Sequence, residues 1–145
     1  MKLQDLLKKK GSTIFSVKRD DVICKAIDLF NQKRIGSVMV MEDEKLIGIL
    51  TERDIIKRLY HDKGNVKNVK ISELMTASKD IITIDEGKSI EDAMDIMIEH
   101  NVRHIPVFKD DKLVGVISIG DVVKALLFVA KKEKEILKDY INSSY

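Results

Sequence analysis

The stretch GILTERDIIKRL, residues 48–59, recurs in altered form as GVISIGDVVKAL, residues 115–126. Both stretches carry a glycine, two apolar residues, a hydroxyl residue and, three positions later, an aspartate. The apolar residues predict the end of a strand, and the hydroxyl residue predicts the first turn of a helix. The sequence therefore predicts that one strand-to-helix unit occurs twice.

The duplication extends well beyond these stretches. A shift of 67 positions places residues 13–59 on residues 80–126 without a gap, and twelve pairs are identical. Internal repeats of this kind predict a duplicated structural unit. Each copy is predicted to have the order β-α-β-β-α, an α+β fold. The predicted strands are 14–17, 37–41 and 45–50, then 81–84, 104–108 and 112–117; each copy has one helix after its first strand and one after its third.

The two copies are expected to pack on each other as a pseudo-twofold pair, because about fifty residues bury little core alone. The segment LQDLL, residues 3–7, resembles ISELM, residues 71–75, and precedes the first copy as ISELM precedes the second. We expect residues 1–62 to hold this lead-in and the first repeat, 63–130 the linker and second repeat, and 131–145 a helical extension with a polar tail. Asp20 or Asp21 is expected to cap the first helix, and either Ser89 or the turn at Asp85–Gly87 is expected to open its counterpart.

The composition limits the partners and the cellular location that can be expected. The net charge of +2 among 145 residues makes nucleic acid an unlikely partner. The single cysteine, Cys24, suits a reducing cytosol, so a cytoplasmic location is expected. The most apolar segment, residues 125–130, is too short to cross a membrane.

The chain closely resembles a CBS-domain pair, a tandem repeat named after cystathionine β-synthase. The motifs that carry the resemblance are the G-h-h-[ST]-x-x-D element (h, apolar), the spacing of apolar residues that opens each repeat, the strand VRHIPV at 102–107 and the tandem itself. The resemblance covers roughly residues 3–130. It implies that the chain is a regulatory module rather than an enzyme. Such modules bind AMP, ADP, ATP or sometimes S-adenosylmethionine in clefts between the repeats. It also implies a homodimer and a separate regulated protein.

The hydroxyl–aspartate pairs have two compatible interpretations. Thr51 and Ser118 are predicted to cap a helix, with Asp54 and Asp121 reaching back toward the cap, although aspartate is a shorter arm than the usual glutamate. The resemblance implies that each aspartate also accepts hydrogen bonds from the two hydroxyls of a ribose. We call each hydroxyl–aspartate pair a clamp.

The resemblance also assigns phosphate contacts. Arg103 and His104 stand where the family carries basic residues that meet the phosphate, and helix N-termini add backbone donors. Gly36 and Ser37 replace them in the first repeat, while Arg53 of the first clamp has Gly120 as its counterpart. The two ligand sites are therefore expected to be unequal.

By the same resemblance, adenine would lie between apolar walls, formed by the first strand of a repeat and the edge of the hairpin that follows it. The residues expected there are Ile14, Phe15 and Ser16 in the first repeat, and Ile81, Ile82 and Thr83 in the second.

Other readings remain open. His100 and His104 have the i, i+4 spacing of helical metal ligands, but a helix end between them and the lack of a third ligand favour no metal site. One alternative function is a dimerisation module without a ligand. Another is a nucleic-acid-associated regulator that uses Lys8–Lys10, Lys67 and Lys70.

Overall fold

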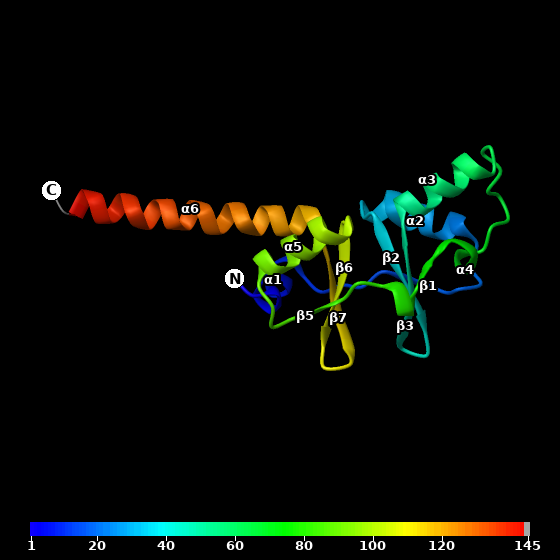
Figure 1. Cartoon of the computed structure of the whole chain (residues 1–145), viewed down its shortest axis with the longest axis horizontal. Coiled ribbons are helices and arrows are strands. Elements are labelled where there is room, and N and C mark those ends of the chain that lie inside the picture. The colour runs from blue at the N-terminus through cyan, green and yellow to red at the C-terminus, as the bar shows by residue number, and fades with distance from the viewer. Residues whose placement is uncertain (144–145) are drawn as a thin grey trace. The chain divides into compact units, whose positions relative to one another are not determined.

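The computed structural model describes residues 1–143 of the chain and consists of two compact units. The first-repeat unit is Thr13–Ile82, and the second-repeat unit combines Met1–Ser12 with Thr83–Tyr145. Each unit is a small sheet covered by helices, which confirms the predicted α+β class (Figure 1).

The first-repeat unit contains a four-stranded sheet of order β1-β2-β3-β4. Its strands are β1 (Ser16–Val17), β2 (Ser37–Glu42), β3 (Lys45–Thr51) and β4 (Thr76–Ala77), of which β1 runs parallel to β2 and the other pairs are antiparallel. Its helices are α2 (Ile23–Lys33), α3 (Glu52–His61), the short α4 (Ile71–Leu74) and a 3₁₀ turn η1 (Ser78–Asp80). Val38, Val40 and Leu50 are fully buried in its core.

The second-repeat unit has a three-stranded sheet of order β5-β6-β7. Its strands are β5 (Ile84–Asp85), β6 (His104–Lys109) and β7 (Lys112–Ser118), and its helices are α1 (Leu3–Lys10), α5 (Ile90–His100) and α6 (Ile119–Ser143). Ile105, Val107 and Ile117 occupy the positions that Val38, Val40 and Leu50 hold in the other unit, and they are also fully buried. The first strand of each repeat is shorter than predicted.

The predicted hairpins are present at the same place in both units. Asp43 and Glu44 adopt positive φ values of 50° and 64° in the turn between β2 and β3, and Asp110 adopts 53° between β6 and β7. Aspartate tolerates this left-handed region better than most residues. A register shift lies just before each turn, at Val40/Met41 and Val107/Phe108, so the duplication preserves even the irregularity of the sheet.

The caps of the two matching helices differ. Ser89 caps α5 as predicted, because its hydroxyl accepts a hydrogen bond from the Asp92 backbone N–H at 3.0 Å. The prediction of Asp20 or Asp21 as the cap of α2 is wrong, since Val22 holds that position. Asp21 instead uses its carboxylate to accept the Lys18 backbone N–H at 2.8 Å, which stabilises the turn before the helix.

The observed units differ from the expected domains in where the lead-in segments pack. Leu3, Leu6 and Leu7 of α1 are buried in the core of the second-repeat unit, whereas residues 1–62 were expected to form one domain. Conversely, Ile71 of α4 is buried in the first-repeat core. Backbone bonds explain the arrangement: Leu3 N–H donates to the Lys88 carbonyl, and Ile71 N–H donates to the Asp21 carbonyl, both at 2.9 Å.

Helix α6 continues far beyond the core that it helps to form. Its buried residues, Val122 and Ala125, lie in its first two turns, and every described residue from 131 onward is exposed. Helix α6 runs through the expected helical extension as far as Ser143, while the end of the expected polar tail lies outside the described residues. None of the helices in residues 1–143 combines the length and the apolar character needed to cross a bilayer.

Candidate functional site

In each unit, the residues of the predicted clamp lie where a hairpin ends and a helix begins. The sheet register places Ser37 opposite Thr51 in one unit and His104 opposite Ser118 in the other. The backbone N–H of the first residue of the following helix then donates a hydrogen bond to the residue just before the neighbouring strand. Glu52 N–H donates to the Gly36 carbonyl at 3.1 Å, and Ile119 N–H donates to the Arg103 carbonyl at 2.8 Å.

In the first clamp, Asp54 reaches back to Thr51. Its Oδ2 accepts the Thr51 backbone N–H at 2.9 Å and the Thr51 hydroxyl at 3.1 Å, while the Asp54 N–H donates to Thr51 Oγ1 at 3.4 Å. This is a complete capping box, so the short arm of aspartate is sufficient. The prediction of a helix cap is confirmed, and the box fixes the direction of the carboxylate.

The second clamp has the same box and one additional partner. Asp121 Oδ2 accepts the Ser118 N–H at 2.8 Å, and Asp121 N–H donates to Ser118 Oγ at 3.1 Å. The same Oδ2 also accepts a hydrogen bond from Lys10 Nζ at 2.7 Å. Lys10 comes from the end of α1 and donates a second bond to the Val116 carbonyl at 2.7 Å.

These contacts alter the acidity of the second clamp. Burial of the Asp121 carboxyl works to raise its pKa, but the hydrogen bonds from Lys10 and from the Ser118 N–H outweigh burial, and the pKa is lowered from the ordinary value. The carboxylate is therefore held in its charged form, with an ammonium group directly against it.

Lys10 is a site residue that the sequence reasoning missed. A signal was present in the alignment of the lead-ins, where Leu7 and Met75 correspond. Leu7 lies against Gly115 and Met75 lies against Gly48 in the same way. In that alignment Lys10 corresponds to Ser78, so only the second clamp receives a lysine from its lead-in.

The other predicted residues are distributed unequally around the clamps. Arg103 is exposed and directly precedes β6, and His104 is half-buried and begins that strand opposite Ser118. In the first-repeat unit, Ser37 is buried, and Gly36 and Arg53 are half-buried.

The residues predicted to contact adenine lie in the first strand of a repeat or in the segment just before it. Ser16 is exposed and pairs with Met39 across the parallel strands β1 and β2, while Ile14 is half-buried just before β1. Ile82 is half-buried and is the last residue of the first-repeat unit. The structure thus places Ser16 on the strand beside β2, two positions from the pairing of Ser37 with Thr51.

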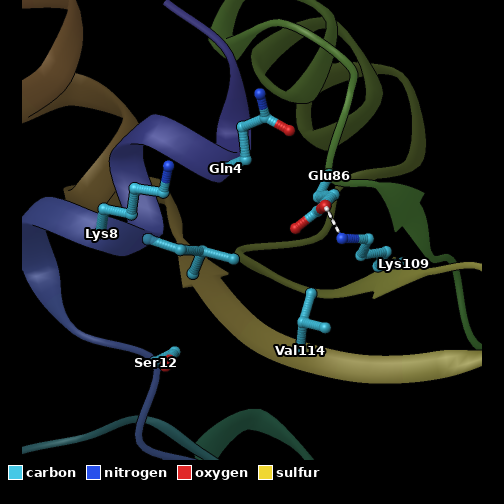
Figure 2. Close-up of a pocket in the computed structure, with 7 residues that line it drawn as sticks. Gln4, Lys8, Ser12, Glu86, Lys109 and Val114 are labelled. Carbon is cyan, nitrogen blue, oxygen red and sulfur yellow. Dashed lines mark ion pairs between the residues drawn. The ribbon is translucent and has the colours of Figure 1, made fainter.

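A separate pocket opens in the second-repeat unit between α1 and the β6–β7 hairpin (Figure 2). It has a volume of about 340 Å³ and is lined by Gln4, Leu7, Lys8, Ser12, Glu86, Lys109 and Val114. The Lys109 ammonium lies 3.8 Å from Glu86 Oε1 at its rim. None of the predicted site residues lines this pocket, because it depends on α1, which the sequence assigned to the other repeat.

The histidine pair does not form a helical metal site. His100 ends α5, Asn101 follows in a left-handed conformation with φ of 53°, and His104 begins β6. Within residues 1–143, no group of three or more His, Cys, Asp or Glu side chains is placed to hold a metal ion.

Comparisons with known proteins agree on one family. The family model for the CBS domain matches residues 10–61 and 71–128. The mitochondrial CBS domain-containing protein CBSX3 of Arabidopsis thaliana is 31% identical, and the match covers 99% of this chain and 73% of that protein.

Solved structures give the same result. The CBS-domain protein NE2398 is 38% identical, with a TM-score of 0.81 over 88% of this chain and 98% of that chain. The CBS domain pair of protein MJ0100, solved with 5′-methylthioadenosine and S-adenosyl-L-methionine, is 24% identical, with a TM-score of 0.76 over 90% of this chain and 98% of that chain. At that identity the likeness to MJ0100 concerns the fold.

Proposed function

Because this chain belongs to the CBS-domain family, we propose that it is a regulatory module that senses adenine nucleotides through its two hydroxyl–aspartate clamps. CBS-domain pairs commonly bind adenosine-containing ligands and are regulatory rather than catalytic proteins. The proposal is that AMP, ADP or ATP binds with its ribose at Asp54 or Asp121. S-adenosylmethionine remains a further candidate of the same chemical class.

The observation that carries the proposal is the direction of the two carboxylates. In both clamps, the hydrogen bonds that the carboxylate accepts within residues 1–143 all go to Oδ2, which the capping box turns toward the backbone. Oδ1 is left to accept a bond from elsewhere. A carboxylate held by a helix cap with one oxygen available is suited to a ribose hydroxyl.

Donors for a phosphate lie beside the second clamp. Arg103 and His104 lead into β6 directly opposite Ser118, and the N-terminus of α6 begins one residue later. A guanidinium fork and the N-terminal end of a helix both favour anionic oxygens. The first clamp has Gly36 and Ser37 at the same positions, so we expect it to depend more on Arg53.

The adenosine-bound structure of MJ0100 supports the ligand class, since that CBS pair holds 5′-methylthioadenosine and S-adenosyl-L-methionine. For the present chain, a homodimer and a separate regulated protein are part of the proposal. Ligand binding would act on that protein by favouring one of two arrangements of the helices that contact it. This requires that the ligand bind the two arrangements with different affinities.

The test is calorimetric titration of the purified chain with AMP, ADP, ATP and S-adenosylmethionine. Asp54→Ala and Asp121→Ala should each remove one binding site and leave the circular dichroism spectrum unchanged. Asp92→Ala is the matched control, because Asp92 forms the same capping box with Ser89 at the start of α5. It loses an equivalent cap and should keep both sites.

The rival functions have distinct outcomes. Absence of heat with every adenosine compound would favour a dimerisation module without ligand. Affinity for RNA or DNA that falls steeply with added salt would favour the nucleic-acid-associated regulator. Unchanged nucleotide affinity in both aspartate variants would contradict the ribose assignment.

A further inference from the structure

We propose that Lys10 closes the second clamp in the ligand-free protein, and that a ribose binds at Asp121 only after the lysine side chain has been displaced. The inference rests on the proposed function of the clamps and concerns the regulation of one of them. It makes Lys10 a further source of the difference in affinity between the two sites, beside the basic residues that the two repeats do not share.

The first step concerns the lone pairs of one oxygen. Asp121 Oδ2 accepts two hydrogen bonds, from the Ser118 N–H at 2.8 Å and from Lys10 Nζ at 2.7 Å. A carboxylate oxygen has two lone pairs, so this oxygen is saturated. A ribose presents two neighbouring hydroxyls, and a contact through both of them uses both oxygens of the carboxylate. With Lys10 in place, only one hydroxyl has an acceptor.

The first clamp lacks this obstruction. Asp54 Oδ2 also accepts two bonds, but the second donor is the hydroxyl of Thr51, the same residue that caps the helix. A hydroxyl can rotate about its C–O bond and release the acceptor, and it carries no charge. The Lys10 ammonium carries a full positive charge, so its bond to Asp121 is also an ion pair, which the Thr51 hydroxyl does not form with Asp54.

The second step concerns what must move. Leu3, Leu6 and Leu7 fix α1 in the second-repeat core, with exposed fractions of 0%, 6% and 5%. Lys10 lies one turn after Leu7, at the last position of the helix, and its side chain remains 30% exposed. The lysine stem has four flexible carbons, so the ammonium can leave for solvent while the helix stays in place. Displacement is therefore a side-chain movement.

The third step concerns the affinity of the second site. Lys10 also donates to the Val116 carbonyl at 2.7 Å, so two acceptors hold it over the clamp. A ligand must exchange these bonds for its own, and a partly exposed ion pair contributes only modestly to stability. Lys10 therefore lowers the affinity of the second site without abolishing binding.

The experiment uses the Asp54→Ala background, in which only the second site remains. Adding Lys10→Met keeps the length of the side chain and removes its charge. We expect AMP to bind this double variant on the order of fivefold more tightly than Asp54→Ala alone, measured by calorimetry. Lys8→Met in the same background is the control, because it removes an equal charge from an exposed position of the same helix.

A second measurement does not depend on ligand. The pKa of the Asp121 carboxyl, followed by carbon-13 NMR, should rise in Lys10→Met and stay constant in Lys8→Met. If the pKa rises but AMP affinity is unchanged or weaker, Lys10 does not compete with the ribose, and the inference is overturned while the proposed function stands. If no variant, wild type included, binds any adenosine compound, the proposed function fails and the inference fails with it.

Discussion

Asp121 accepts hydrogen bonds from two residues at very different distances along the chain. Ser118 lies three positions before it, and Lys10 lies 111 positions away. The local partner follows from the helix start and could be predicted from the spacing of the hydroxyl and carboxyl residues. The distant partner depends on where α1 packs, and no local pattern contains that information.

The acidity of Asp121 leads to a prediction about pH. A carboxyl whose pKa is lower in the folded than in the unfolded chain stabilises the fold above the unfolded pKa, about 3.9, and loses this contribution as pH falls through the folded pKa. The difference in unfolding free energy between wild type and Asp121→Asn should therefore shrink below about pH 4.

Urea denaturation at pH 7 and at pH 3 measures this difference. Lys10→Met should change the pH dependence in the same direction, because it removes one of the two bonds that hold the carboxylate charged. A constant gap between wild type and Asp121→Asn at the two pH values would contradict the assignment.

Among the elements, the lead-in helices explain the glycines of the duplicated strands. A Cβ atom built on Gly115 would lie 2.6 Å from Leu7 Cδ2, and one built on Gly48 would lie 2.5 Å from Met75 Sδ. Real Cβ atoms do not approach other atoms so closely, so a lead-in residue packs directly over each glycine. The sequence showed both glycines and both lead-ins, but it did not show that they touch.

This packing predicts a pairwise effect on stability. Gly115→Ala should lower the unfolding free energy by about 1–3 kcal/mol, because the added methyl group overpacks against Leu7. Leu7→Ala alone should also destabilise by about 2–5 kcal/mol, through loss of a buried side chain.

The double variant should lose less than the sum of the two, since the smaller residue makes room for the methyl group. Chemical denaturation of the four proteins completes the cycle. Strict additivity would show that α1 does not pack on Gly115 in solution.

For the molecule as a whole, the two units share a plan but differ at their margins. The first has a fourth strand, β4, formed directly after its lead-in α4, and the second has the long helix α6. Between residues 131 and 143, the extension exposes four large apolar side chains: Ile136, Leu137, Tyr140 and Ile141. None of them belongs to the core of the second-repeat unit.

Removal of residues 131–145 should therefore change the unfolding free energy of the monomeric chain by no more than about 0.5 kcal/mol. Removal of residues 1–10 is the contrasting variant, and it should destabilise strongly because it strips Leu3, Leu6 and Leu7 from the core. Thermal denaturation at several protein concentrations compares them. A concentration-dependent loss of stability in the shorter chain would instead place part of a homodimer interface on the extension.

The sequence by itself determined the repeated β-α-β-β-α order, the hairpins, and the helix caps at Thr51 and Ser118. These features depend on residues close together in the chain, on alternating burial and on turn chemistry, and both copies preserve them. Only the tertiary structure decided that each lead-in packs with a particular repeat, that Leu7 covers Gly115, and that Lys10 reaches Asp121. Those contacts join segments far apart in sequence, so they are selected by the shape of the buried surface, which a local pattern does not encode.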